Sequence, residues 1–362
     1  MSKRPTLGAT VVMSMVVLAS LAGCFRDLAS TGTGPDGASS GVDAVAQYQT
    51  PPQGDDGHLD EQAMGDSASP EGQADVSATA LTSALKGLRY TLPEGVNAEM
   101  ATLDLYRRDD GLIRPLVVLV HGGSWVGGDK ANFDVAAPDF IPWWLDRGYV
   151  VASVNFRLAS KITEPQTVRP TDQASDIAHA IAWLISQGDV HKIAPDAVVL
   201  VGYSSGAHLV ALLGADGRYL EAAGLAETVL KATVSLDVHA YDVPFALELM
   251  VGSVVEENVP LITHLFGETT DEQLLASPIH YAKGWVAPAL IVSVDTDPEV
   301  VGSYGYLVSQ AAENYVSALT AQGHIASSYH DVSETHTSLA VGFGVASDGV
   351  TAAVGTFLDL LP

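Results

Sequence analysis

A serine stands between a predicted strand and a predicted helix. The letters GYSSG at residues 202–206 follow the apolar run AVVLV at 197–201 and precede AHLVALL at 207–213. A strand that turns at once into a helix forces the intervening serine into strained backbone dihedrals, and glycine on both sides lets the backbones pass closely. The hydroxyl then stands clear of the sheet, at the positive end of the next helix. This nucleophile elbow predicts that Ser204 attacks a substrate.

A second glycine-rich turn points to the same chemistry. The apolar run at 116–120 leads directly into HGGSW, which begins at His121. Two glycines at the end of a strand can turn their N–H groups towards one point, as an enzyme needs to hold a developing oxyanion. We predict an oxyanion hole formed by the N–H groups of Gly122, Gly123 and Ser205. The alternative is an ordinary glycine turn, and His121 itself is expected to be structural.

Four motifs together resemble the α/β-hydrolase esterases. They are HGGSW at 121–125, GGDK at 127–130, SVNFRL at 153–158 and GYSSGAHL at 202–209. The nearest branches are those related to hormone-sensitive lipase, the feruloyl-esterase-like carboxylesterases and kynurenine formamidase. The resemblance covers roughly residues 85–362, a length usual for one domain. Ser124 replaces the third glycine of the lipase-type loop, and Ser205 stands where alanine is common, but neither change removes a backbone donor.

The resemblance also implies an acid that follows the serine and precedes the histidine along the chain. Asp295 and Asp297 come directly after the apolar, β-branched run at 289–294. The family spacing, glycine, two residues, aspartate, two residues, valine, selects Asp297, although Val294 replaces the usual glycine. An aspartate in such a place can instead cap a helix or form a turn. Asp295 therefore stays an alternative, and Asp237, at the end of an earlier apolar run, is a third candidate.

The catalytic base is sought among eleven histidines. A base must come from the edge of the sheet where the nucleophile lies, because parallel strands bring their carboxyl ends together there. His336 meets this condition, since it follows the last predicted strand at about 325–332. His324 would lie at the opposite end of that strand and His330 within it. His208, just inside the helix after the nucleophile, is expected to pack or to form hydrogen bonds.

These residues predict acyl transfer in two halves. Ser204 attacks a carbonyl carbon, His336 takes the hydroxyl proton, and Asp297 stabilises the imidazolium that forms. Water then releases the acyl group. No metal or other cofactor is expected, because no His, Cys, Asp and Glu residues have the spacing of a zinc site. The predicted function is a serine carboxylic-ester hydrolase acting on small molecules. The alternatives are an amide hydrolase, arylformamidase-like or a peptidase, and a non-catalytic surface binding module.

The beginning of the chain resembles a bacterial lipoprotein signal. Lys3 and Arg4 precede an apolar stretch at 7–22, which ends in the letters LAGC at Cys24. The stretch is too short for a convincing spanning helix, so residues 1–23 are predicted to be a signal peptide that is removed. Cys24 is the only cysteine of the chain. We expect it to carry the lipid that anchors an exported protein in the cell envelope or at the cell surface, the alternative being a chance cysteine.

The next segment has a different composition. Residues 25–80 contain ten acidic residues and one arginine and few large apolar ones, so we expect a disordered tether before a catalytic domain at 81–362. The formal net charge of the chain is −26. This balance argues against nucleic acid and anionic lipid surfaces as partners, which leaves the lipid anchor as the expected link to a membrane.

The remaining sequence predicts an α/β fold with a mostly parallel eight-stranded sheet and helices on both faces. Apolar runs predict the strands, and helical spacing is clearest at 172–187 and 303–322. The predicted strands are 89–92, 102–106, 116–120, 149–154, 198–202, 232–236, 289–294 and 325–332.

The segment at 238–281 is longer than a crossover helix needs. It predicts either a small cap over the site, between the sixth and seventh strands, or peripheral packing. His239 and His264 fall in this segment, where a substrate contact is one role open to them. Trp125 and Tyr203 are candidate residues of the substrate pocket, although a tyrosine beside the nucleophile is more often a packing residue.

Overall fold

The computed structural model describes residues 82–294 and 300–361 of the 362-residue chain. The predicted signal peptide, Cys24, the acidic tether, Asp295 and Asp297 lie outside the described residues. The description below therefore concerns the predicted catalytic domain.

Eight strands form one sheet in the order β1-β2-β4-β3-β5-β6-β7-β8. β2 runs antiparallel to both of its neighbours, and the pairs from β4 to β8 are parallel. The expected mostly parallel sheet is thus confirmed. The strands are β1 (Thr82–Arg89), β2 (Thr102–Arg108), β3 (Arg114–Val120), β4 (Val150–Val154), β5 (Ile193–Tyr203), β6 (Leu230–Leu236), β7 (Ala289–Val294) and β8 (Ala326–Asp331).

The first strand is not where the sequence predicts it. The predicted segment 89–92 lies almost entirely beyond β1, which ends at Arg89. Tyr90 and Leu92 are buried although they lie in a loop, and the hydroxyl of Tyr90 donates to the backbone oxygen of Asn155 at 2.7 Å. Tyr90 and Leu92 thus belong to a buried loop. The strand predicted at 89–92 from its hydrophobic pattern is therefore misplaced.

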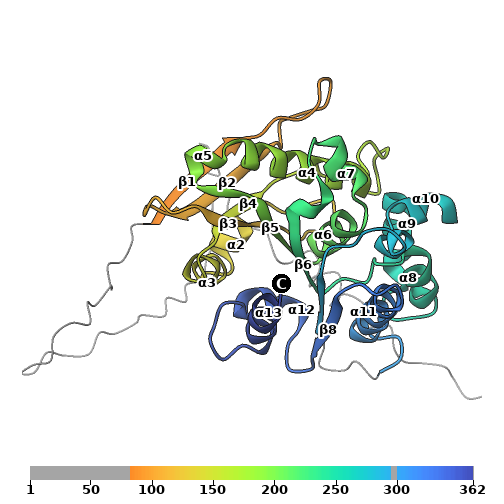
Figure 1. Cartoon of the computed structure of the whole chain (residues 1–362). Coiled ribbons are helices and arrows are strands. Elements are labelled where there is room, and N and C mark those ends of the chain that lie inside the picture. Colours follow the sequence, from red (N-terminus) through yellow and green to blue (C-terminus); the bar gives the residue numbers. More distant parts are fainter. Residues whose placement is uncertain (1–81, 295–299, 362) are drawn as a thin grey trace, which may run out of the picture. The chain divides into compact units, whose positions relative to one another are not determined.

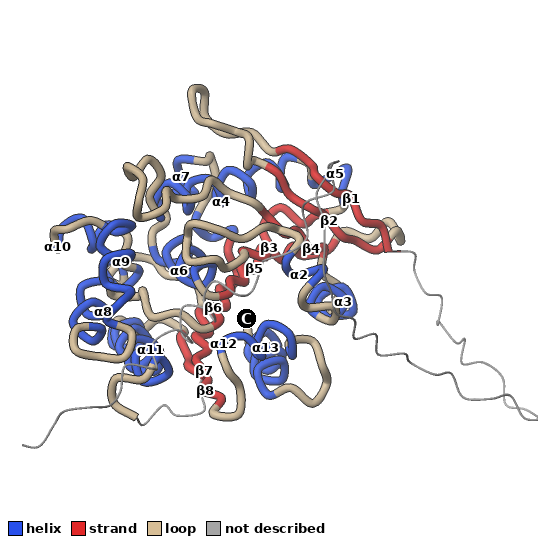
Figure 2. Tube along the Cα trace, turned by 180° about the vertical axis from the view of Figure 1, so that it is seen from behind, coloured by secondary structure: helices blue, strands red, loops and turns tan. Residues whose placement is uncertain are grey.

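Helices cover both faces of the sheet (Figures 1 and 2). One face carries α4 (Pro170–Ser186), α6 (Ser205–Ala215) and α11 (Tyr304–Ala321), and the other carries α3 (Phe140–Asp146), α12 (His336–Gly342) and α13 (Gly349–Asp359). The shorter helices are α2 (Asn132–Val135), α5 (Gly188–His191), α7 (Arg218–Ala222) and the 3-10 turn η2 (Glu227–Val229). Within the described ranges, no helix is long and apolar enough to cross a bilayer.

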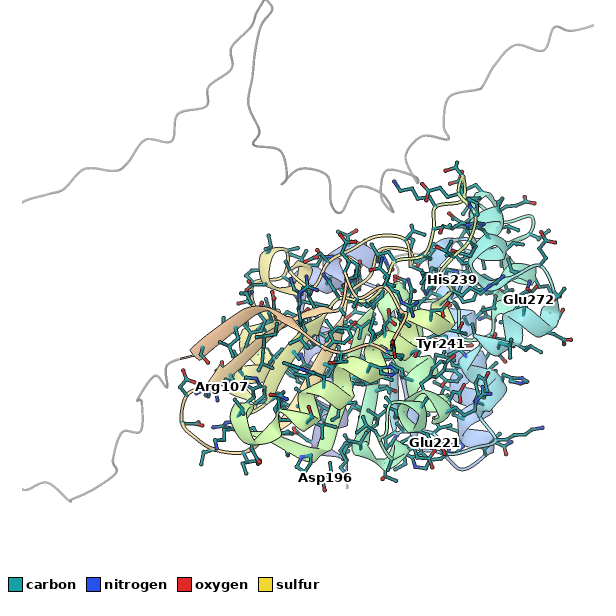
Figure 3. All side chains as sticks on the ribbon, turned by 90° about the horizontal axis from the view of Figure 1, so that it is seen from above. Arg107, Asp196, Glu221, His239, Tyr241 and Glu272 are labelled. Atoms are coloured by element: carbon teal, nitrogen blue, oxygen red, sulfur yellow. The ribbon has the colours of Figure 1, made fainter. Side chains whose placement is uncertain are left out.

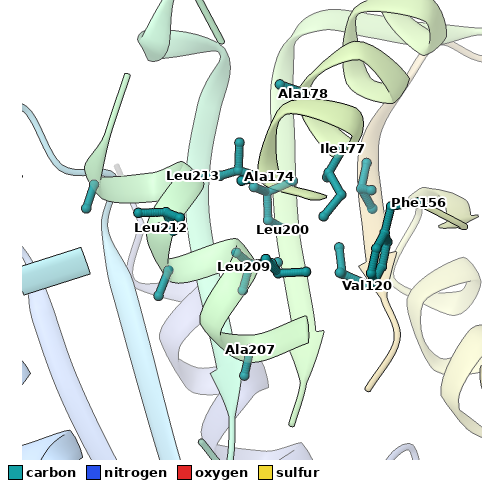
Figure 4. Close-up of a cluster of buried hydrophobic side chains, with 14 of the residues drawn as sticks. Val120, Phe156, Ala174, Ile177, Ala178, Leu200, Ala207, Leu209, Leu212 and Leu213 are labelled. Atoms are coloured by element: carbon teal, nitrogen blue, oxygen red, sulfur yellow. The ribbon is translucent and has the colours of Figure 1, made fainter. Parts of the chain in front are cut away.

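The larger core packs α4 and α6 against the middle of the sheet (Figure 4). Ile177 and Ile181 come from one stripe of α4, with the four-residue spacing of an amphipathic helix. They are buried, with Leu209 of α6 and Leu200 of β5 in the same apolar cluster. Each such side chain contributes roughly 1.5–3 kcal/mol by leaving water. This core fixes the strand and the helix on either side of Ser204.

The predicted long connection is a helical insertion, which we define as residues 238–281. It contains α8 (Val243–Met250), η3 (Glu256–Asn258), α9 (Val259–Phe266), α10 (Thr270–Leu275) and η4 (Pro278–Tyr281). Phe266 meets the ring of Trp125 edge-on at 5.1 Å, and the backbone oxygen of Ala276 accepts a hydrogen bond from His208. The insertion therefore packs directly on the residues that surround the predicted oxyanion loop.

Candidate active site

Ser204 occupies the turn between β5 and α6. Its φ of 56° and ψ of −125° lie outside the helical and extended regions that most residues adopt. A Cβ added to Gly202 would lie 2.1 Å from the backbone oxygen of Gly206, and one added to Gly206 would lie 2.1 Å from that of Val120. Both flanking glycines are thus required, because a side chain at either position would collide with backbone.

The loop after β3 lies against the nucleophile. A Cβ added to Gly122 would lie 2.8 Å from the Cβ of Ser204. Within the described part of the chain, the N–H groups of Gly122, Gly123 and Ser205 have no hydrogen-bond partner. The structure therefore places Gly122 against Ser204, next to the N–H of Ser205, and the role of the three N–H groups as an oxyanion hole stays a prediction.

A chain of hydrogen bonds holds this loop in place. The indole N–H of Trp125 donates to Nδ1 of His208 at 3.2 Å, and Nε2 of His208 donates to the backbone oxygen of Ala276 at 2.7 Å. The side-chain amide of Gln173 donates to the backbone oxygen of Trp125 at 2.7 Å. Burial lowers the pKa of His208 to about 4, so its ring is neutral and accepts at Nδ1. His208 links the loop after β3 to the helical insertion through these hydrogen bonds, in agreement with the packing or hydrogen-bonding role expected for it.

His121 and Trp125 are largely enclosed by protein. His121 is buried and stacks on Phe156, with ring centroids 4.5 Å apart, and burial lowers its pKa to about 4. Trp125 is 4% exposed. Its ring contacts His208 and Phe266 of the helical insertion, and its role as a wall of the substrate pocket stays a prediction.

His336 begins α12, directly after the cap residue Thr335. Its Nδ1 lies 2.5 Å from Oδ2 of Asp237, and the other carboxylate oxygen of Asp237 accepts the N–H of Val294 at 2.9 Å. Asp237 is fully buried. The carboxylate is thus held by the neighbouring strand and orients the imidazole.

Tyr203 holds the opposite side of His336. The two rings stack with centroids 4.9 Å apart, and the tyrosine hydroxyl donates to the backbone oxygen of His336 at 2.7 Å. Tyr203 therefore positions the histidine, whereas the sequence analysis considered it for the substrate pocket.

Strand register brings the serine close to this pair. β5 and β6 are parallel, and Tyr203 pairs with Leu236, so Ser204 and Asp237 follow neighbouring strand ends. The N–H of Ser204 donates to the backbone oxygen of Leu236 at 2.8 Å. Among the described residues, no hydrogen bond joins the hydroxyl of Ser204 to His336, and such bonds are often long before substrate binds.

The acid that the sequence analysis favoured, Asp297, and its alternative, Asp295, lie outside the described residues. The carboxylate that contacts His336 in the structure belongs to Asp237, the third candidate for the acid in the sequence. Its φ of 62° is rare for a residue other than glycine. Among the described residues, five that are not glycine have a positive φ. Four of these lie at this edge of the sheet: Ser124, Trp125, Ser204 and Asp237. Such strain gathers at functional sites.

A mostly parallel sheet with a serine elbow after β5 and a histidine after β8 defines the α/β-hydrolase fold. The chain belongs to the BD-FAE family, whose model matches residues 103–311, more than half of its length.

The chain is also similar to individual esterases. It is 25% identical over 287 residues to the esterase LipQ of Mycobacterium tuberculosis, covering 75% of this chain and 62% of LipQ. It is 32% identical over 116 residues to the esterase LipC of the same organism, covering 31% of this chain and 26% of LipC. The matches thus span less than two thirds of these relatives. The crystal structure of esterase B from Lactobacillus rhamnosis shares the fold, with a TM-score of 0.57, 18% identity and coverage of 77% of this chain and 86% of that one.

Proposed function

We propose that this protein is a serine carboxylesterase that works through an acyl-enzyme intermediate. The observation that carries the proposal is the oriented His336–Asp237 pair, which lies at the same edge of the sheet as Ser204. The names of the similar proteins LipQ and LipC, both esterases, agree with it.

In the first half of the reaction, the Oγ of Ser204 forms a bond to the carbonyl carbon of the ester. Nε2 of His336 takes the hydroxyl proton, and Asp237 stabilises the resulting imidazolium through Nδ1. The carbonyl oxygen becomes an oxyanion, which accepts hydrogen bonds from the N–H groups of Gly122, Gly123 and Ser205. Each such donor contributes roughly a hundred- to a thousand-fold in rate.

His336 then returns its proton to the leaving alkoxide, so that the alcohol departs and the first half ends with the acyl group on Ser204. In the second half, water attacks the acyl carbon while His336 takes one of its protons and then passes it to the departing Oγ of Ser204. The acid is released, and Ser204 regains its hydrogen. These steps need side chains, backbone N–H groups and water.

We assign the orienting acid to Asp237 in place of Asp297. One oxygen of Asp237 meets His336 and the other accepts a backbone N–H, so the carboxylate cannot turn away. A buried carboxylate with both oxygens engaged holds the imidazole in one tautomer, with the proton on Nδ1. Nε2 is then free to accept the serine proton.

Hydrolysis of p-nitrophenyl esters of graded acyl length tests the ester proposal. Ser204→Ala should lose essentially all turnover, by roughly a million-fold if the precedent of a similar triad applies. Ser205→Ala is the matched control, because only the backbone N–H of Ser205 takes part, and it should keep most of the activity. A Ser204→Ala variant as active as its parent would overturn the proposal.

The same apparatus cleaves amides, so the substrate class needs its own comparison. N-formylkynurenine and an aminoacyl p-nitroanilide should be turned over far more slowly than the best ester. A kcat/KM for N-formylkynurenine above that for every ester would instead make the protein a formamidase.

We also propose that the protein is exported and anchored by lipid on Cys24. The sequence LAGC after an apolar stretch supports this proposal. Several acyl chains on one cysteine would hold the protein firmly, because one chain alone binds a bilayer only marginally. In a bacterial host, the parent should incorporate a labelled fatty acid and fractionate with membranes. Cys24→Ala should do neither, and an unchanged Cys24→Ala variant would refute the anchor.

A further inference from the structure

His239 is a buried histidine that the proposed mechanism does not use. It follows the acid Asp237 by two residues, in the loop after β6, on the side of the molecule where α8–α10 lie (Figure 3). It is 8% exposed, and neither ring nitrogen has a hydrogen-bond partner in the described structure. An unpaired buried polar atom is costly, so each ring nitrogen of His239 would gain from a hydrogen-bond partner that the described structure does not supply.

One aromatic ring, that of Tyr304, separates His239 from His336. The ring of His239 meets that of Tyr304 edge-on, with centroids 6.2 Å apart. Tyr304 in turn meets the ring of His336 edge-on, with centroids 5.5 Å apart. Burial lowers the pKa of His239 to about 4. The ring is therefore neutral near pH 7, with one nitrogen that donates and one that accepts.

We propose that His239 binds a hydroxyl group of the substrate, so that the enzyme prefers esters that carry a hydroxyl near the scissile bond. This inference rests on the proposed esterase function and names the substrate class. A simple alkyl ester has only hydrogen-bond acceptors, and it can pair with the N–H of the ring at most. The accepting nitrogen stays unpaired unless the substrate brings an O–H or N–H group. A hydroxyl supplies that donor beside the ester that Ser204 attacks.

Two matched pairs of esters test the inference with the purified protein. On the alcohol side, 2-hydroxyethyl butyrate is compared with propyl butyrate, which has a methyl group in place of the hydroxyl. On the acyl side, methyl 3-hydroxybutyrate is compared with methyl 3-methylbutyrate. In at least one pair the parent should prefer the hydroxylated ester by roughly tenfold or more in kcat/KM, as expected for a site built to pair a hydroxyl.

His239→Phe keeps a ring of similar size but removes both polar atoms, so the preference should fall to about one. His239→Gln restores one donor and one acceptor, and part of the preference should return. The control is His191→Phe. His191 lies before β5, at the opposite edge of the sheet, and its Nδ1 is also buried and unpaired. The variant His191→Phe should leave the preference for the hydroxylated ester unchanged. The melting temperature of His239→Phe should equal or exceed that of the parent, because unpaired polar atoms are removed.

Three results would overturn the inference: no preference in either pair, an unchanged preference in His239→Phe, or a marked drop in the melting temperature of that variant, which would make the ring structural. The esterase proposal is tested separately in the same assays. If Ser204→Ala abolishes turnover while His239→Phe keeps the parent's preference, the substrate inference alone fails. If Ser204→Ala stays active, the proposed function fails.

Discussion

At the scale of single residues, the proposed site contains groups that would react and groups that hold them in place. Ser204 and His336 would exchange the proton. Asp237 and Tyr203 fix the imidazole from two sides, one through Nδ1 and the other through ring stacking and a backbone hydrogen bond. Positioning of this kind accounts for much of the rate in a triad, because the base must meet the serine in one tautomer and one orientation.

Replacing each candidate aspartate by asparagine shows whether Asp237 or Asp297 is the acid that orients His336. We expect Asp237→Asn to lower kcat for p-nitrophenyl butyrate by roughly ten-thousand-fold, since an amide can hold the wrong tautomer of His336. Asp297→Asn, measured alongside, should stay within roughly tenfold of the parent. The reverse order of these two losses would return the acid to Asp297.

Removal of the Tyr203 hydroxyl should have a smaller effect. Tyr203→Phe keeps the ring that stacks on His336 but loses one hydrogen bond of about 1 kcal/mol. We expect kcat to fall by about fivefold or less and KM to change little. A loss comparable to that of Ser204→Ala would mean that the hydroxyl takes part in the chemistry.

Some residues of the proposed site can be recognised in the sequence more readily than others. Ser204 and Gly122 stand in contiguous motifs, where strand, turn and helix identify them together. Asp237 has no such setting, because an aspartate at a strand end looks the same whether it caps, turns or orients a histidine. The choice depends on which strand end reaches His336, and that distance is set by the packing of β6, β7 and α12.

At the scale of elements, the site depends on close backbone approach between the turns after β3 and β5. Gly122 fits against Ser204, Gly128 fits against the backbone oxygen of Gly122, and Gly206 passes the end of β3. These contacts leave no room for a methyl group. The glycines therefore set the distance between the oxyanion donors and the nucleophile.

Gly206→Ala tests this contact. Its Cβ would lie 2.1 Å from the backbone oxygen of Val120, so α6 or β3 must move. We expect the free energy of unfolding in urea to fall by at least about 3 kcal/mol. Gly284→Ala serves as control, since its Cβ would meet the nearest atom at an ordinary 3.5 Å. Equal stability of the two variants would contradict the packing described.

Strands in the middle of the sheet could be predicted because they are buried on both faces and form continuous apolar runs. β3, β5 and β7 appear where those runs are. β1 is an edge strand whose side chains are mostly exposed or half-buried, so it carries no such signal. The buried loop residues Tyr90 and Leu92 supplied a stronger apolar pattern than the strand itself.

At the scale of the whole molecule, buried neutral histidines couple folding to pH. Burial lowers the pKa of His121, His208 and His239 to about 4, whereas a histidine in an unfolded chain has its ordinary value near 6.5. Between these values the unfolded chain binds protons that the folded protein does not. Stability is therefore fully present above about pH 6.5 and is lost as the pH falls towards 4.

We expect urea unfolding to show this loss between pH 7 and pH 5, a range above the ordinary pKa of aspartate and glutamate. Each of the three histidines contributes up to about 1.4 kcal/mol per pH unit once its unfolded form is protonated. His208→Gln should reduce the slope of stability against pH, and replacement of the exposed His280 by glutamine should not. A parent whose stability is the same at pH 7 and pH 5 would refute the coupling.

The fold class could be predicted from the sequence, because the apolar runs alternate with helical patterns. The contacts of the helical insertion could not, because its helices are short and their apolar residues fit either peripheral packing or a cap. Phe266 and Ala276 become informative only when folding places them on Trp125 and His208.

Covalent labelling with a fluorophosphonate tests most directly the claim that Ser204 is an activated nucleophile. The reagent reacts with serines made nucleophilic by a neighbouring base, and peptide mass spectrometry locates the adduct. We predict one adduct, on the peptide that contains Ser204, formed much more slowly in His336→Ala and absent in Ser204→Ala. An adduct on another serine, or an unreactive parent that still hydrolyses esters, would contradict the account.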